Sequence, residues 1–225
     1  MSLCYLDKDT LFCFAIVCFK LYHNCTTKVE NPIKIRNVIF SKGSLNHKQA
    51  ISLDDVAKFH GHLCDGVVVG FLGAKEALYK LYPDGLIDRS NTRIISKSSP
   101  CLTDVAIYLT GGRYQFNTFF VSDSIDYTYI IQRINDGKAF GVKLKPGIKP
   151  KEIDSLGILA NQLKLSACEL NDLWKKENIF LKNLLKSDSS KIFIIEEVNN
   201  FIWKPKLENN YTKTDIINKK AGRCH

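Results

Sequence analysis

Residues 59–82, FHGHLCDGVVVGFLGAKEALYKLY, join a segment that carries histidine and cysteine to a long apolar segment. From residue 67 onward the large apolar side chains recur at helical spacing, which predicts a helix packed into the core. Gly70 and Gly73, three residues apart, allow another element to approach this helix closely. The Pro-Asp-Gly sequence at 83–85 ends it. The stretch therefore predicts a buried central helix with a polar loop at its start.

The segment before this stretch predicts a second, shorter helix. Ser52 can cap a helix N-terminus, and Asp54 and Asp55 fall in the first turn, where the helix dipole favours negative charge. This helix is expected to run through Phe59, and ordered structure is expected to begin at Ser52. Residues 26–49 are mostly polar, and we interpret them as a linker that carries at most a short strand.

After this stretch, predicted strands and helices mix. Strands are predicted at residues 92–97, 115–121, 127–134, 138–144 and 192–195, and helices at 102–109, 151–164 and 169–185. Asp136-Gly137 is typical of a hairpin, because the turn needs a positive φ. No Gly-x-Gly-x-x-Gly turn follows a strand, which argues against a dinucleotide-binding fold. We predict an α+β fold, an antiparallel sheet with helices packed on it in a single compact domain.

The basic charge is concentrated at the two ends of the chain. The net charge of +9 is typical of nucleic-acid binding, yet residues 1–49 hold 7 basic against 3 acidic residues and residues 204–225 hold 6 against 2. Residues 50–203 keep 19 against 18 and are nearly neutral, so no nucleic-acid partner is expected. We divide the chain into an N-terminal extension at 1–49, a domain at 50–205 and a basic tail at 206–225.

The eight cysteines do not fit a disulfide scaffold. Four lie in the first 25 residues and one is next to last, which leaves Cys64, Cys101 and Cys168 in the domain. Reduced thiols in a cytoplasmic protein fit this spacing better. The apolar run LFCFAIVCF at residues 11–19 is shorter than the about 20 residues that a membrane-spanning helix needs, so no stable membrane insertion is expected. Export through a poor signal segment is the alternative.

Two imidazoles and a thiol fall within five residues, at His60, His62 and Cys64, between two predicted helices. Nitrogen and thiolate sulfur are the ligands that zinc and other borderline transition metals prefer. The helix that begins near Gly66 favours the thiolate form of Cys64, which we expect to be the most reactive thiol of the domain. Ordinary loop histidines beside a buried cysteine are the alternative interpretation.

A second segment, SSPCLTD at residues 98–104, places Cys101 where a strand passes into a helix. Asp104, one turn later, points the same way and can orient a ligand histidine or accept a proton. Arg113 can meet an anionic substrate, and Asn117 can line the same pocket. The candidate catalytic residues are Cys64, Cys101 and Asp104, and the candidate substrate-binding residues are Arg113 and Asn117.

The sequence resembles a known family at two places. His60-Gly61-His62-Leu63-Cys64, followed by Gly66 and a glycine-punctuated apolar helix, is similar to the signature of the formylmethanofuran dehydrogenase E-subunit family. CLTDVAI at 101–107, followed by Leu109-Thr110-Gly111, resembles its second motif, in which a cysteine precedes an aspartate by three. The resemblance covers roughly residues 50–150. It implies an α+β fold and a metal pocket lined by His60, His62, Cys64 and Cys101.

The sequence departs from the family pattern in ways that bear on this pocket. Where the family usually has a proline after the first cysteine, this chain has Asp65. Where the family usually has a further cysteine after Thr-Gly, this chain has Gly112. The family's Gly-Lys-Gly-Asn is replaced by YQFN at 114–117, and instead of a tail of paired Cys-x-x-Cys there are Cys224 and His225. These departures predict one mononuclear site, with zinc the favoured ion, rather than a metal cluster. No run of iron–sulfur cysteines supports formylmethanofuran oxidation.

Together these features predict a metal-binding protein with a redox or metal-assisted enzymatic role on a small molecule. A non-enzymatic accessory subunit, or a metal carrier for another oxidoreductase, is the alternative. Without a metal, Cys64 and Cys101 would form a thiol pair for redox exchange. The expected partners are a small-molecule substrate or a partner oxidoreductase, and a homodimer is allowed.

Overall fold

The computed structural model describes residues 32–40 and 42–204, and its central element is the apolar helix α3 (Asp65–Leu81). The side chains of Phe71, Leu72 and Leu78 on this helix are fully enclosed. A second helix, α4 (Pro100–Thr110), packs along α3. Because enclosing one such apolar side chain contributes roughly 1.5–3 kcal/mol, the helix pair supplies much of the stability of the core.

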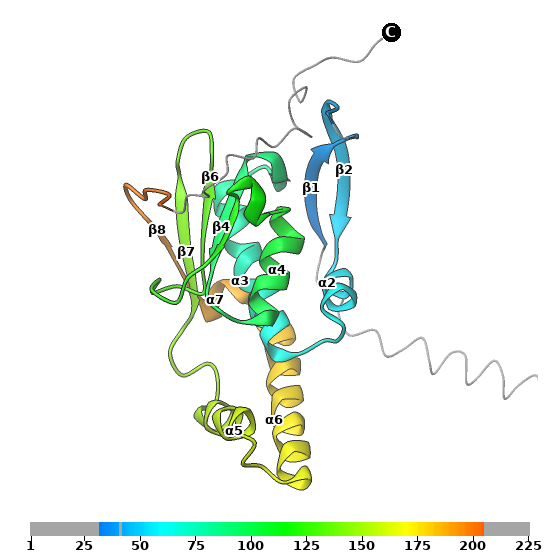
Figure 1. Ribbon diagram of the computed structural model, residues 1–225, viewed down its shortest axis with the longest axis vertical. Helices are drawn as coiled ribbons and strands as arrows, with labels where there is room; N and C mark the ends of the chain where they lie inside the picture. The colour runs from blue at the N-terminus through cyan, green and yellow to red at the C-terminus, as the bar shows by residue number, and fades with distance from the viewer. Residues whose placement is uncertain (1–31, 41, 205–225) are drawn as a thin grey trace, which may run out of the picture.

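A five-stranded sheet covers one face of these two helices (Figure 1). Its strand order is β5-β4-β6-β7-β8. The strands are β4 (Thr92–Ser96), β5 (Phe119–Val121), β6 (Tyr129–Arg133), β7 (Ala139–Leu144) and β8 (Phe193–Glu197). The prediction of an α+β fold in a single domain is confirmed, and Gly137, with φ 73°, lies in the predicted turn between β6 and β7.

The sheet is mixed, which corrects the expectation of an antiparallel one. β4 pairs antiparallel with β6 but parallel with β5. Between β4 and β5 the chain passes through α4 and a short 3-10 helix, η2 (Tyr114–Phe116). This crossover brings the chain back to the sheet in its original direction, so the two strands it joins are parallel. The 3-10 turn also shortens the strand predicted at 115–121.

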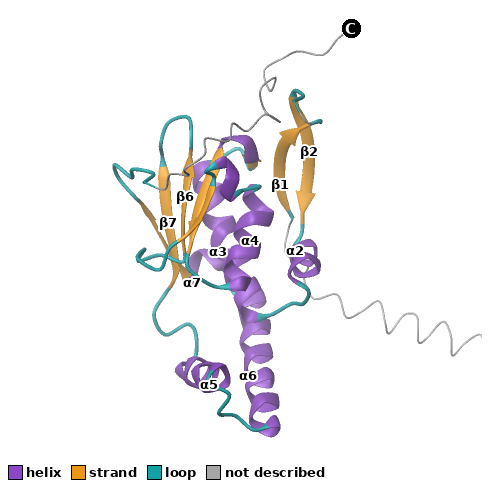
Figure 2. Cartoon of the chain, in the orientation of Figure 1, coloured by secondary structure: helices purple, strands orange, loops and turns teal. Residues whose placement is uncertain are grey.

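A second, smaller sheet lies on the other side of the helices (Figure 2). Its order is β2-β1-β3, built from β1 (Ile33–Val38), β2 (Leu45–Ile51) and β3 (Leu86–Asp88). β1 and β2 form an antiparallel pair, whereas β1 and β3 are parallel. The hairpin occupies the segment predicted as a linker, so the expectation that order begins at Ser52 was wrong. Sequence pattern missed it because most residues of β2 are polar and exposed, and the buried pair on β1 is only Ile33 and Ile35. The predictions for residues 1–31 and for the basic tail at 206–225 lie outside the described residues.

The remaining helices frame the core. Helix α2 (Leu53–His60) begins at Ser52 as predicted, with Ser52 and Asp55 forming a reciprocal capping box. Helices α5 (Lys151–Asn161) and α6 (Ala167–Lys186) follow the strands, and the short elements η1 (Arg89–Asn91) and α7 (Ser189–Ile192) complete the chain order. Figure 1 shows that α5 and the N-terminal half of α6 extend away from the sheets. Among the described residues, no helix combines the length and the apolar character needed to cross a bilayer.

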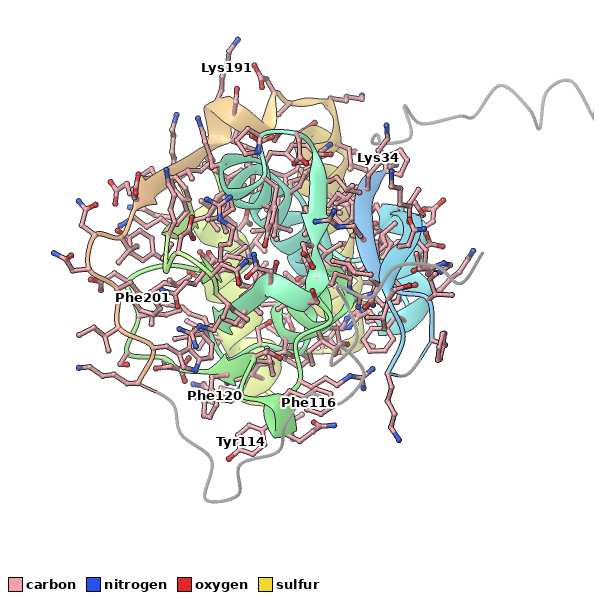
Figure 3. All side chains as sticks on the ribbon, turned by 90° about the horizontal axis from the view of Figure 1, so that it is seen from above. Lys34, Tyr114, Phe116, Phe120, Lys191 and Phe201 are labelled. Atoms are coloured by element: carbon pink, nitrogen blue, oxygen red, sulfur yellow. The ribbon has the colours of Figure 1, made fainter. Side chains whose placement is uncertain are left out.

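The first prediction tests whether β1 belongs to the domain. Ile35→Ala should lower the free energy of unfolding by about 2–5 kcal/mol, because it empties a fully buried site. Lys34→Ala, on the exposed face of the same strand (Figure 3), should change it by less than about 0.5 kcal/mol. Urea denaturation followed by circular dichroism measures both. Equal stability of the two variants would mean that β1 is a linker after all.

Candidate metal centre

The loop between α2 and α3 brings the first thiol to a helix N-terminus. Gly61 ends α2 in the left-handed region, with φ 102°, and turns the chain toward α3. Cys64 then occupies the cap position of α3, where its Sγ accepts a hydrogen bond from the backbone N–H of Val67 at 3.4 Å. Cys101 is the second residue of α4. Both thiols therefore lie at the positive ends of helix dipoles, which favours their thiolate forms.

The two thiols meet although 37 positions separate them in the sequence. Cys64 Sγ and Cys101 Sγ are 3.4 Å apart. With one ring nitrogen of His60 they form a group whose ligand atoms all lie within 4.8 Å of one another. All three residues are partly buried. The structure thus brings together one imidazole and two thiols, each from a different helix or helix end.

His60 is held by Asp104, the residue that the sequence singled out as a ligand-orienting carboxylate. His60 Nδ1 lies 2.8 Å from Asp104 Oδ2, and the His60 side chain is 7% exposed. A proton on Nδ1 completes this hydrogen bond and leaves the Nε2 lone pair available. An imidazole that donates to a carboxylate through one nitrogen and binds a metal through the other is the common arrangement in metal sites.

Close helix packing sets the position of Cys101. A Cβ atom on Gly66 would lie 2.9 Å from Cys101 Cβ and 3.0 Å from Cys101 Sγ, so no larger residue fits there without movement. One turn later Gly70 makes room for Tyr129 of β6, whose hydroxyl would be 2.6 Å from a Cβ at that position. The fully buried Tyr129 hydroxyl donates to the Leu102 carbonyl at 2.9 Å and fixes the first turn of α4.

The hydrogen bond between the sulfurs separates the two thiols in acidity. The Cys64 thiol donates to Cys101 Sγ, and this bond lowers the pKa of Cys101 to about 7. The same bond, followed by burial, raises the pKa of Cys64 well above its ordinary range. Without a metal, the first thiolate to form is therefore that of Cys101. The bond thus favours Cys101 as the more acidic thiol, and the sequence-based expectation that Cys64 is the most reactive one stays a prediction, which alkylation of the metal-free protein tests.

The other residues that the sequence proposed for the site lie farther away. His62 is exposed and outside the group, although its ring centroid is 4.8 Å from that of His60. Arg113 and Asn117 follow the C-terminal end of α4, whereas Cys101 lies at its start. Eleven residues of helix separate these ends by about 15 Å. Asn117 instead accepts a hydrogen bond from Trp203 Nε1 at 3.0 Å. The Trp203 ring lies 6.2 Å from that of Phe120, which Figure 3 shows near Tyr114 and Phe116.

Two residues near the site carried no signal in the sequence. Lys149 Nζ lies 3.3 Å from Asp65 Oδ2 and 3.1 Å from Asp154 Oδ1, which ties the start of α3 to α5. Asp65 itself is buried and accepts a hydrogen bond from the Gly66 N–H at 2.8 Å. Tyr129, which holds the start of α4 through the Leu102 carbonyl, is the second residue that the sequence did not indicate. Both reach the site from distant segments, so no local pattern could have identified them.

The donor set of His60, Cys64 and Cys101 suits a borderline metal ion. Around a tetrahedral zinc ion with zinc–sulfur distances of about 2.3 Å, two sulfurs lie about 3.8 Å apart. The observed 3.4 Å needs to open by only a few tenths of an ångström. Two thiolates and a neutral imidazole would balance the charge of a divalent ion and would supply three of the four ligands of a tetrahedral site.

The mixed sheet, the buried helix pair and this group define an α+β protein with a histidine–cysteine site that can hold a metal ion. The family described as "FmdE, Molybdenum formylmethanofuran dehydrogenase operon" matches residues 59–194, and the chain belongs to that family. One similar solved structure is a tungsten formylmethanofuran dehydrogenase FmdE-like protein from Syntrophus aciditrophicus, at 18% sequence identity and a TM-score of 0.40. The similarity covers 70% of this chain and 78% of that one. A search of curated proteins found no match.

The second prediction tests the packing beneath the sulfurs. Gly66→Ala should weaken zinc binding by about tenfold or more, because the new methyl group must push Cys101 away from Cys64. A competition titration against a chromophoric chelator measures the affinity. Gly157→Ala is the matched control, since Gly157 lies in α5 and a Cβ there would meet nothing within 4 Å. Equal zinc affinity for wild type and Gly66→Ala would contradict this account of the packing.

The third prediction concerns the pH dependence of alkylation in the metal-free protein. Only the thiolate reacts, so the rate at Cys101 should rise to a plateau just above its pKa of about 7. The exposed Cys168 is the comparison site in the same sample. Peptide mass spectrometry after timed iodoacetamide treatment resolves the two sites. Removing the donor with Cys64→Ala should move the Cys101 profile to higher pH, and parallel profiles in the wild type would refute the assignment.

Proposed function

We propose that this protein binds one transition-metal ion, with zinc favoured, through His60, Cys64 and Cys101, and uses it in a redox or metal-assisted reaction on a small molecule. The observation that carries the proposal is the convergence of three ligand atoms within 4.8 Å from two sequence segments. The hydrogen bond from His60 to Asp104 supports it, because it leaves the opposite ring nitrogen free to bind. When bound, such an ion would supply Lewis acidity at the fourth, open position.

The protein's own groups have separate roles in this proposal. The N-terminal ends of α3 and α4 stabilise the two thiolates. Asp104 holds the His60 ring in place and accepts the hydrogen bond from its Nδ1. Gly66 and Tyr129 keep Cys101 within reach of Cys64. The loop at His62 is exposed, so a small molecule can approach from that side.

An accessory subunit or metal carrier for another oxidoreductase is the second candidate. Two observations favour it. The family's description refers to the operon of a dehydrogenase, which makes a partner oxidoreductase a natural proposal. In addition, Arg113 and Asn117, proposed to bind substrate, lie at the far end of α4 from Cys101. A homodimer is part of the same proposal, supported by the exposed apolar side chains of Ile158, Trp174 and Ile179 on α5 and α6.

The metal-free form offers a dithiol alternative, supported by the 3.4 Å between the sulfurs. The Cys101 thiolate would attack a disulfide of a partner molecule, releasing one partner thiolate and forming a mixed disulfide. Cys64 would then lose its proton and attack Cys101 Sγ, releasing the second partner thiolate and leaving a Cys64–Cys101 disulfide. Two electrons pass to the partner. The free thiols of Cys64, Cys101 and Cys168 support a cytoplasmic location for either role.

The fourth prediction assigns the ligands. Cys64→Ser, Cys101→Ser and His60→Ala should each lose the stoichiometric zinc that elemental analysis detects after dialysis. Asp104→Asn should retain the ligands but bind zinc about 10–100-fold more weakly, because it orients His60 less firmly. Cys168→Ser, at an exposed position on α6, is the control and should keep its zinc.

His62→Ala separates an open site from a closed one. With three protein ligands the variant should keep its zinc, which favours chemistry at the open position. Loss of zinc on this substitution would make His62 a fourth ligand and the site a structural one. Zinc retention by all the ligand variants, with no change in affinity, would contradict the proposed site.

A further inference from the structure

A polar pocket lies between β2, α2 and α4. Its volume is about 470 Å³, and its lining residues are Gln49, Ala50, Ile51, Asp55, Arg89 and Tyr108. None of the three proposed metal ligands lines it. Tyr108 follows Asp104 by four residues, so the pocket begins about 6 Å along α4 from the carboxylate that holds His60. The pocket is therefore a neighbour of the metal centre and not a part of it.

Arg89 brings an unsatisfied positive charge to this pocket. Its Nε is buried without a hydrogen-bond partner among the described residues. The Nε of Arg36 is also buried without a partner, but the Nη2 atom of Arg36 forms an ion pair with Asp88 at 3.3 Å. Arg89 takes part in none of the ion pairs between described residues. Burial lowers the pKa of Arg89, and the nearby charge of Arg113 lowers it further. A buried N–H without an acceptor is costly, and the charge of this partly buried guanidinium has no carboxylate partner among the described residues, so the site favours an anion.

The fold holds this guanidinium in place. Gly111 ends α4 with φ 65°, and a Cβ atom there would lie 2.7 Å from Arg89 Nε and 3.0 Å from its terminal nitrogen. Arg89 therefore packs flat against the backbone at the end of α4. The one carboxylate of the pocket lining does not neutralise it, because Asp55 Oδ2 accepts hydrogen bonds from Ser52 N at 2.9 Å and Ser52 Oγ at 2.7 Å.

We propose that this pocket binds the carboxylate group of a small organic acid, with Arg89 as its main anchor. A planar guanidinium matches a carboxylate through two parallel hydrogen bonds. The Gln49 amide and the Tyr108 hydroxyl line the same space and can donate to the same group. The negative charge of Asp55 in the lining favours a singly charged carboxylate over a doubly charged phosphate.

Thermal unfolding of the full-length, metal-free protein in increasing acetate tests this proposal, with chloride keeping the ionic strength constant. Binding to the folded state should raise the melting temperature with acetate concentration. In Arg89→Met that rise should disappear. Arg93→Met is the matched control, because Arg93 is also partly buried but bonds to Gln132 and stacks on Trp203, so the dependence on acetate should remain.

Gln49→Leu provides a variant at an exposed strand position that leaves the core intact. It should raise the dissociation constant for acetate several-fold without lowering the melting temperature in chloride. Equal acetate dependence in wild type, Arg89→Met and Gln49→Leu would overturn the proposal, and so would no acetate dependence in the wild type. Stronger stabilisation by inorganic phosphate than by acetate would overturn the choice of a carboxylate. None of these readouts depends on zinc, so the test is separate from that of the metal centre.

Discussion

The contact between Gly66 and Cys101, where the first turns of α3 and α4 meet, is the constraint on which the site depends. No side chain separates the two helices there, since even a methyl group on Gly66 would lie 2.9 Å from Cys101 Cβ. Tyr129 fills the next turn and holds the α4 backbone through the Leu102 carbonyl. Because protein cores are close-packed, a larger residue at Gly66 or Gly70 would shift α4 and alter the distance between the two sulfurs.

The electrostatic environment of this contact favours negative charge on the two sulfurs. Negatively charged sulfur is the form that can bind a metal ion or react with a redox partner. Two helix N-termini point at the same pair of thiols, and their dipoles stabilise thiolates. Asp104 opposes this locally by its own charge, but it is bound to His60 and serves to orient the ring. Asp65 is balanced by Lys149, which connects the site to α5. The site and the Arg89 pocket thus both border α2 and α4, and negative charge is favoured at each of them.

Much of the candidate site could be predicted because its residues fall in two short motifs. Cys64 and Cys101 were expected at helix starts, and Asp104 one turn beyond Cys101, and the structure places them there. Arg113 and Asn117 could not be placed, because the length of α4 carries them about 15 Å from Cys101. Tyr129 and Lys149 could not be predicted, because each contacts the site from a segment that is distant in sequence, Tyr129 through Leu102 and Lys149 through Asp65.

The sequence by itself determined the local elements, because helical spacing, the Ser52 cap and the Asp136-Gly137 turn act over only a few residues. It also determined which ligand atoms a metal could meet, because imidazole nitrogen and thiolate sulfur are properties of the histidine and cysteine side chains themselves. Only the tertiary structure decided that β5 runs parallel to β4, that β1 enters the core, and that the two thiols lie 3.4 Å apart. Each of these depends on packing between segments far apart in the chain, where no local pattern specifies the partner.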